Sequence, residues 1–277
     1  MQQRRSQKPQ KSKITYIDLV DSSDSEDEKP RHREQKQKKQ KTENKLENLN
    51  EKERVKEKEA EQLEQKPLRR TKSIYGPQEE ALLAVITSIP SQLETLRNES
   101  IKLYFFASSR DEAPGKGYKH ETVPDEFADE FKDLAEIKDW RKKISDMYLC
   151  RFELNGLTWN SVEHYYQASK FVKKNPEFYR SFSVESETQL SKDAKLAKMA
   201  GAKNSSTRSS TITIDPDFLA KGRGKIELFR ALYAKFTQNP ELENILRLTR
   251  NATLIFVSPI DRSEIEMMIL EHLRSIL

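Results

Sequence analysis

Cysteine occurs once among the 277 residues, at Cys150. A single thiol excludes an intrachain disulfide and is typical of proteins in a reducing compartment. The sequence also lacks any apolar run long enough to span a membrane and any apolar segment typical of a signal peptide. We therefore expect an intracellular protein of the cytoplasm, the nucleus or both, which is not secreted and makes no membrane contact.

Glycine and aromatic residues are nearly absent from the first quarter of the chain. The first of the seven glycines is Gly76, and Tyr16 is the only aromatic residue before Tyr75. Because such a segment cannot bury enough apolar surface to offset chain entropy, residues 1–75 are predicted to be a disordered, charged region. Residues 76–277 are predicted to form a single domain with its core in 101–277.

The sequence has neither a strong net charge nor a cluster of metal ligands. The 50 Lys and Arg residues against 45 Asp and Glu leave a net charge of +5, too mild to indicate nucleic acid by itself. Basic clusters at 31–41 and 66–72 are either nuclear-import signals and weak nucleic-acid contacts or a solvated linker. One cysteine and four scattered histidines give no ligand set, so we expect no metal and no cofactor.

A short apolar segment interrupts the polar N-terminal region, within residues 14–28. Its anchors Ile17, Leu19 and Val20 are followed at once by acidic residues. Such a segment can add as a strand to a partner's sheet edge, and this one resembles a SUMO-interacting motif. Ser23 and Ser25 each have an acidic residue three positions on, as acidophilic kinase sites do, and phosphate there would add negative charge. The alternative is an accidental apolar island.

The hydrophobic periodicity of residues 76–277 predicts a helix-rich α+β domain with a small antiparallel sheet. Strands are predicted at 101–107 and 252–257, and a hairpin around Asn155-Gly156, a pair typical of two-residue turns. One long helix is predicted over 125–143. Ser263 and Glu266 have the spacing of a capping box for a last helix that ends at Leu277.

The stretch after the hairpin carries the strongest functional signal. Asn160 is predicted to cap a helix in which Glu163 takes the third position. At about 3.6 residues per turn, one helix face carries four functional side chains: Glu163, Tyr166, Gln167 and Lys170. A carboxylate, a ring, an amide and an ammonium thus project side by side from a rigid element. The alternative is structural, with Glu163 in a capping box and Lys170 a solvated lysine.

One carboxylate among rings and cations suits cleavage of an N-glycosidic bond, which passes through an oxocarbenium-like ribose. Glu163 can stabilise that cation or take a proton from the attacking water. Lys170 can attack a ring-opened sugar and form a Schiff base. Aromatic side chains are predicted to form walls that hold the base or the sugar. Arginines are predicted to bind the phosphates through bidentate contacts. These residues are Tyr104, Phe105, Trp140, Arg141 and Arg223.

Four segments in chain order resemble the NADAR superfamily, also called YbiA-like. They are the strand 103–106 and the stretches 139–146, 159–171 and 231–239. The resemblance implies a YbiA-like fold and N-glycosidic hydrolysis of ribosylated amines, such as phosphoribosylated riboflavin precursors or ADP-ribosyl-guanine in nucleic acid. It matches Glu163 to the family's acid and Lys170 to its helix lysine.

The chain departs from the family pattern in two places. Many members have Asn where this chain has Asp146, and many bacterial members have an Asp-x-x-Trp-Gly-Asp loop that residues 258–262 replace. The chain is closer to a eukaryotic and large-DNA-virus branch. This argues against carrying over the bacterial small-molecule substrate.

The predicted function is therefore an N-glycosidase acting on an ADP-ribosyl or phosphoribosyl compound. Its predicted substrate-binding set also includes Ser145, Asp146, Trp159, Tyr166 and Gln167. One alternative is a non-catalytic module that binds ADP-ribose or a nucleotide and is recruited to SUMO-like partners by its tail. Another is an adaptor whose domain has lost its activity. The presence of both Glu163 and Lys170 favours the hydrolase, since a binder needs no acid beside the anomeric carbon.

Overall fold

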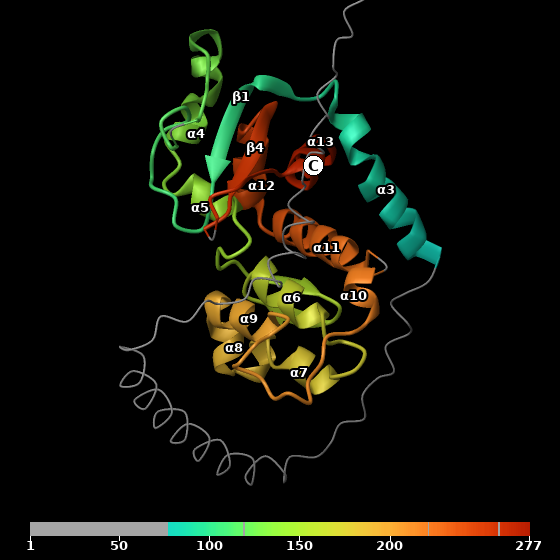
Figure 1. Cartoon of the computed structure of the whole chain (residues 1–277). Helices are drawn as coiled ribbons and strands as arrows, with labels where there is room; N and C mark the ends of the chain where they lie inside the picture. The colour runs from blue at the N-terminus through green and yellow to red at the C-terminus, as the bar shows by residue number, and fades with distance from the viewer. Residues whose placement is uncertain (1–76, 119, 221, 260) are drawn as a thin grey trace, which may run out of the picture. The chain divides into compact units, whose positions relative to one another are not determined.

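The computed structural model describes residues 77–118, 120–220, 222–259 and 261–277. The predicted disordered region 1–75, with its SUMO-interacting-like motif and basic clusters, lies outside these residues. Within them the chain forms helices and short strands (Figure 1).

Helices predominate along the described chain. The first part comprises α3 (Pro77–Leu93), β1 (Asn98–Phe105), the 3-10 helix η2 (Asp125–Phe131), α4 (Lys132–Ala135) and α5 (Trp140–Ile144). The middle comprises β2 (Phe152–Leu154), β3 (Leu157–Trp159), α6 (Val162–Ser169), α7 (Pro176–Arg180), η3 (Val184–Ser186), α8 (Gln189–Lys192) and α9 (Ala194–Gly201). The last part comprises α10 (Asp217–Ala220), α11 (Arg223–Thr237), α12 (Pro240–Leu248), β4 (Ala252–Val257), β5 (Glu264–Glu266) and α13 (Met268–Ile276). The predicted helix-rich α+β class is confirmed.

The strands form a three-stranded sheet of order β1-β4-β5 and a separate hairpin, β2–β3. The predicted antiparallel pairing is present in the hairpin and between β4 and β5. β1 and β4 instead run parallel, with Leu103 opposite Leu254 and Phe105 opposite Phe256. The larger sheet is therefore mixed, because strands joined by a long crossover leave no local turn signal in the sequence.

The hairpin β2–β3 delivers the chain to α6. Its turn residues Asn155 and Gly156 have φ values of 56° and 75°, and a type I′ turn requires positive φ at both positions. Trp159, at the end of β3, is fully buried, and its Nε1 donates to Leu154 O at 3.0 Å. The hairpin predicted from the Asn-Gly pair is confirmed.

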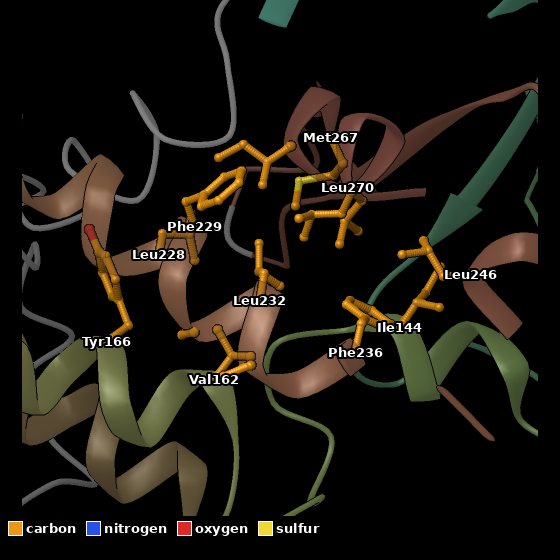
Figure 2. Close-up of a cluster of buried hydrophobic side chains, with 14 of the residues drawn as sticks. Ile144, Val162, Tyr166, Leu228, Phe229, Leu232, Phe236, Leu246, Met267 and Leu270 are labelled. Atoms are coloured by element: carbon orange, nitrogen blue, oxygen red, sulfur yellow. The ribbon is translucent and has the colours of Figure 1, made fainter. Parts of the chain in front are cut away.

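α11 supplies the centre of the hydrophobic core. Figure 2 shows Leu232 of α11 beside Val162 of α6, and Phe236 of α11 beside Ile144 of α5 and Leu246 of α12. α6, the helix that carries the predicted site, therefore packs directly against the main hydrophobic core.

Two predicted helices are wrong in their boundaries. Residues 125–143 form η2, α4 and α5 rather than one helix. The chain breaks at Asp139, which has a φ of 57° and donates its N–H to Asp111 Oδ1 at 2.6 Å. Ser263 and Glu266 form no capping box, because residues 264–266 pair as β5 with the edge of β4 and α13 begins only at Met268.

Candidate active site

α6 begins one residue later than predicted. Its N-cap is Ser161, whose Oγ accepts a hydrogen bond from His164 N at 3.3 Å and lies 2.7 Å from His164 Nδ1. The predicted cap, Asn160, instead donates from Nδ2 to Ser191 O at 2.8 Å. Both residue types cap helices well, so the sequence alone does not decide between them. Glu163 is consequently the second helical residue, not the third.

This shift removes Glu163 from a capping box. Its Oε1 accepts a hydrogen bond from Gln167 Nε2 at 2.8 Å, one turn further along α6. Its backbone N–H donates to Asp146 O at 3.0 Å. The residue is only 6% exposed. A carboxylate that is buried and bonded to a neighbouring amide is held in a defined orientation, as a site requires.

Lys170 is buried rather than solvated, with 1% of its surface exposed. Its Nζ donates to Gly201 O at 3.3 Å. The same atom lies 5.4 Å from the ring centroid of Tyr166 and 5.9 Å from that of Phe218. Aromatic faces attract a cation electrostatically. The ammonium is therefore placed by two rings and one carbonyl.

The end of α9 packs closely against this face of α6. A Cβ built on Gly201 would lie 1.9 Å from Gln167 Oε1 and 2.7 Å from Gln167 Cβ. Only glycine permits so close an approach of the backbone. Gly201 is also the last residue of α9. Its larger role is to confine the Gln167 amide that bonds Glu163.

Arg223 is bound within the fold at the start of α11. Its Nη2 pairs with Asp215 Oδ2 at 2.8 Å, and its Nε lies 3.3 Å from Asp217 Oδ2. Its Nη1 donates to the carbonyl of Ser169, the residue before Lys170, at 2.8 Å. Arg223 thus ties the α10 segment to the end of α6. A role as a phosphate clamp would require these contacts to open.

Arg141 is likewise bound by protein groups, those of the loop 112–121. Its Nη1 donates to Glu112 O at 2.7 Å, and its Nη2 donates to Ala113 O at 3.0 Å and pairs with the Glu121 carboxylate. Burial raises the pKa of the Glu121 carboxyl, and the charge of Arg141 opposes that rise. Glu121 also accepts from Gly115 N at 2.6 Å, so the pair fixes the loop. Sequence reasoning missed Glu121, and no local signal distinguishes it from the other acidic residues.

The predicted aromatic residues of β1 do not form one wall. Tyr104 and Phe105 are adjacent in a strand, so their side chains point to opposite faces of the sheet. Tyr104 stacks on Tyr118, with ring centroids 5.1 Å apart, and donates to Glu264 Oε2 at 3.0 Å. Phe105 packs in the main core against Phe256. Strand alternation therefore places the two rings on different faces of the sheet, in separate clusters of side chains.

Both tryptophans pack on protein groups. Trp140 is buried, and its ring centroid lies 4.1 Å from Cζ of Arg141. Trp159 is buried against Tyr165 and Tyr179, with ring centroids 5.1 and 5.3 Å apart. These contacts make the two rings part of the scaffold on which α5 and α6 rest.

Lys235 of α11 is a buried cation near the site that sequence reasoning missed. Its Nζ donates to Ser145 O at 2.7 Å. The next residue, Asp146, accepts the backbone N–H of Glu163. Burial lowers the pKa of Lys235, and Cys150 and Asp146 oppose that effect. A signal was available in the periodicity of the helix, because this lysine falls on the apolar face.

Two groups can be distinguished among the predicted site residues. In one group, α6 and its C-cap Lys170 bring Gln167 to Glu163 and the Lys170 ammonium to Tyr166, and Asp146 joins Glu163 through its backbone. In the other group, the Glu121 carboxylate binds both the side chain of Arg141 and the backbone N–H of Tyr104. The first group combines an acid with a buried amine and is the candidate active site.

Within the described ranges, no group of three or more His, Cys, Asp or Glu residues is placed to hold a metal ion. In the same residues, no helix combines the length and apolar character needed to cross a membrane.

The profile of the NADAR domain matches residues 118–263, just over half of the chain, and the chain belongs to the NADAR family. The matched region contains Glu163, Lys170 and Lys235. A curated relative is the chloroplastic riboflavin biosynthesis protein PYRR of Zea mays, 33% identical over 106 residues. That match spans 38% of this chain and only 16% of the maize protein. The NMR structure of E. coli YbiA is 18% identical, with a TM-score of 0.40, and the match covers 66% of this chain and 86% of YbiA.

Proposed function

We propose that the domain hydrolyses the N-glycosidic bond of a ribose in an ADP-ribosylated or phosphoribosylated compound, ADP-ribosyl-guanine in nucleic acid being one instance. The observation that carries this proposal is the arrangement on α6. Gln167 orients the buried Glu163 carboxylate, and Lys170 lies on the same helix face between two rings. Membership of the NADAR family supports hydrolase chemistry. The maize relative is named for riboflavin biosynthesis, which agrees with a phosphoribosylated substrate.

In the proposed reaction the bond between C1′ and the base nitrogen breaks, and its electron pair leaves with the nitrogen. The Glu163 carboxylate offsets the positive charge that develops on the ribose. Water adds at C1′, Glu163 takes its proton, and that proton then passes to the leaving nitrogen. The bond from Gln167 Nε2 keeps the carboxylate in one orientation throughout.

Lys170 offers a covalent route to the same products. Once its Nζ has lost a proton, the amine can attack C1′ of the ring-opened sugar and expel the base as an amine. The resulting Schiff base is then hydrolysed by water. In the other role, the ammonium keeps its proton and contacts a substrate phosphate.

The test of Glu163 is the Glu163→Gln variant. The amide oxygen can still accept from Gln167, but it cannot take a proton or offset a cation, so turnover should fall about 10²–10⁴-fold. Binding of the product ADP-ribose should change only a few-fold. Release of guanine from an ADP-ribosylated guanine substrate, measured beside a thermal melt, gives both readings. The matched control is Glu136→Gln, an exposed carboxylate after α4.

Lys170→Ala distinguishes the two roles of the amine. If Nζ attacks the sugar, this variant should lose borohydride-trapped adducts together with turnover. If the ammonium contacts phosphate, turnover should partly survive and affinity should fall. A Glu163→Gln protein that melts normally and turns over at the wild-type rate would remove the catalytic assignment and leave a nucleotide-binding module in its place.

A further inference from the structure

The loop between α9 and α10 lines a cavity of about 250 Å³ that is partly open to solvent. Its polar lining consists of two cations and four hydroxyl groups: Lys203, Arg208, Ser205, Ser209, Ser210 and Thr213. None of the described residues that line it carries a carboxylate. The remaining lining residues, Ile212 and Ile214, are apolar, so the polar part of the lining offers cations and hydroxyl groups only.

This lining and volume favour a phosphate group. Proteins hold phosphate oxygens with lysine and hydroxyl donors, and no carboxylate lines this cavity to oppose the positive charges of Lys203 and Arg208. Pockets that enclose a whole drug-sized ligand usually measure about 300–1,000 Å³. The cavity is smaller than that, so it suits one phosphate with part of its sugar rather than a complete substrate.

Arg208 gives the loop a defined shape. Its guanidinium donates to Lys203 O at 2.7 Å near the start of the loop and to Ile212 O at 3.1 Å near its end. Its Cζ lies 5.3 Å from the ring centroid of Phe171, the residue after Lys170. One cation therefore closes the loop and anchors it on the end of the α6 segment.

The same anchor joins the cavity to the candidate active site. Nη1 of Arg208 donates to Ala200 O at 2.8 Å and to Ala202 O. The residue between them, Gly201, accepts the hydrogen bond from Lys170 Nζ. Arg208, which lines the cavity, therefore binds the two carbonyls on either side of the one that accepts from Lys170.

We propose that this cavity is a subsite for a phosphate group of the substrate. The inference rests on the proposed function for the identity of that substrate. Two sources supply the same chemistry, the diphosphate of an ADP-ribosyl compound and a phosphodiester of a nucleic-acid strand. Lys195 and Lys198 continue the positive charge along α9 outside the cavity, which suits a strand.

The experiment compares the full chain with its Lys203→Ala and Lys203→Glu variants. Lys203 is exposed, so its replacement leaves the fold intact. The control is Lys132→Ala, which removes another exposed lysine, from α4. The ligands are ADP-ribose, followed by calorimetry, and a labelled single-stranded oligodeoxynucleotide, followed by fluorescence anisotropy. Neither readout depends on turnover.

Lys203→Ala should weaken the ligand that uses the cavity by about tenfold, the loss of one charge-assisted hydrogen bond, and Lys203→Glu should weaken it further. For the strand, the slope of log affinity against log salt should also fall by about 0.7. Selective loss of ADP-ribose binding identifies the diphosphate, and selective loss of oligonucleotide binding identifies the strand.

Affinities that match those of the control for both ligands would overturn the subsite, as would a wild-type chain that binds neither. Turnover separates this inference from the proposed function. If the wild-type chain cleaves no ribosylated substrate, but its Lys203 variants bind ADP-ribose or the oligonucleotide more weakly than it does, the subsite is supported and the glycosidase activity is refuted.

Discussion

Lys235 places a charge among apolar side chains at the centre of the core. An ammonium without partners is costly to bury, and here the hydrogen bond to Ser145 O offsets part of that cost. The bond fixes the peptide before Asp146, whose carbonyl receives the N–H of Glu163. Lys235 therefore acts on Glu163 through the backbone, as a positioning residue.

Replacing Lys235 with Met keeps the length of the side chain and removes its donor. We expect kcat to fall by about 10- to 100-fold through misplacement of Glu163, with KM nearly unchanged. The free energy of unfolding should change by less than about 2 kcal/mol, because an apolar residue also removes the desolvation cost. Steady-state kinetics and thermal melts, with Lys132→Met as control, would measure both. Wild-type kcat in a folded Lys235→Met protein would refute the positioning role.

His164 makes stability depend on pH. Burial lowers its pKa from 6.5 to about 4, and Asp193 opposes the shift. Between these two pKa values the unfolded chain binds a proton at His164 that the folded chain does not. The contribution of neutral His164 to stability is therefore fully present above pH 6.5 and is lost as the pH falls toward 4. The loss from this one group is at most about 3 kcal/mol.

The His164→Asn variant isolates this contribution. Asn can still hydrogen-bond Ser161 Oγ, but it does not titrate. Urea melts at several pH values between 7 and 4 should show a smaller loss of stability for the variant than for the wild type. Identical pH dependence in the two proteins would assign the acid sensitivity to other groups, such as His272, whose pKa burial also lowers.

Among the elements, those set by neighbouring residues could be predicted and those set by distant ones could not. The hairpin depends on two adjacent residues, Asn155 and Gly156, and was foreseen. The break at Asp139 depends on a bond to Asp111, far back in the chain. Residues near Ser263 have a local helix signal, yet residues 264–266 pair with β4 and form a strand.

The site follows the same division. Glu163 and Lys170 could be related from their spacing, because α6 carries Glu163 and Lys170 is its C-cap. The roles of Arg141 and Arg223 could not be foreseen, since their partners, Glu121 and Asp215, lie in loops with no periodic signal. The sequence around an arginine does not show that carboxylates of distant loops will bind and bury its side chain.

The contact of α6 with α9 makes Gly201 sensitive to substitution. Gly201→Ala places a Cβ within 3 Å of Gln167, and the two helices must separate. We expect the free energy of unfolding to fall by about 1–3 kcal/mol and turnover to fall with it, because Gln167 no longer holds Glu163. Urea melts and turnover assays would measure the two losses. Met199→Ala, at an exposed position of the same helix, should leave both unchanged.

For the whole molecule, we propose that the segment 14–28 recruits SUMO-like proteins while the domain acts on its substrate independently. Changing both Leu19 and Val20 to Ala should weaken binding of a SUMO-like protein by at least about tenfold, because these are the apolar anchors. Hydrolysis should be unaffected. Calorimetry with the full chain measures the first effect. Changing Leu46 and Leu49 to Ala provides the matched control, and equal affinity of the two double variants would refute the motif.

The parallel pairing of β1 with β4, seen side by side in Figure 1, also has a consequence in time. Leu103 and its partner Leu254 are separated by about 150 residues of chain. A ribosome adding about 5–20 residues per second completes β1 many seconds before β4 exists. During that interval the side chains of Ile101, Leu103 and Phe105 have no strand beside them. The newborn chain must keep this apolar strand from pairing with other chains until its own C-terminal quarter has been synthesised.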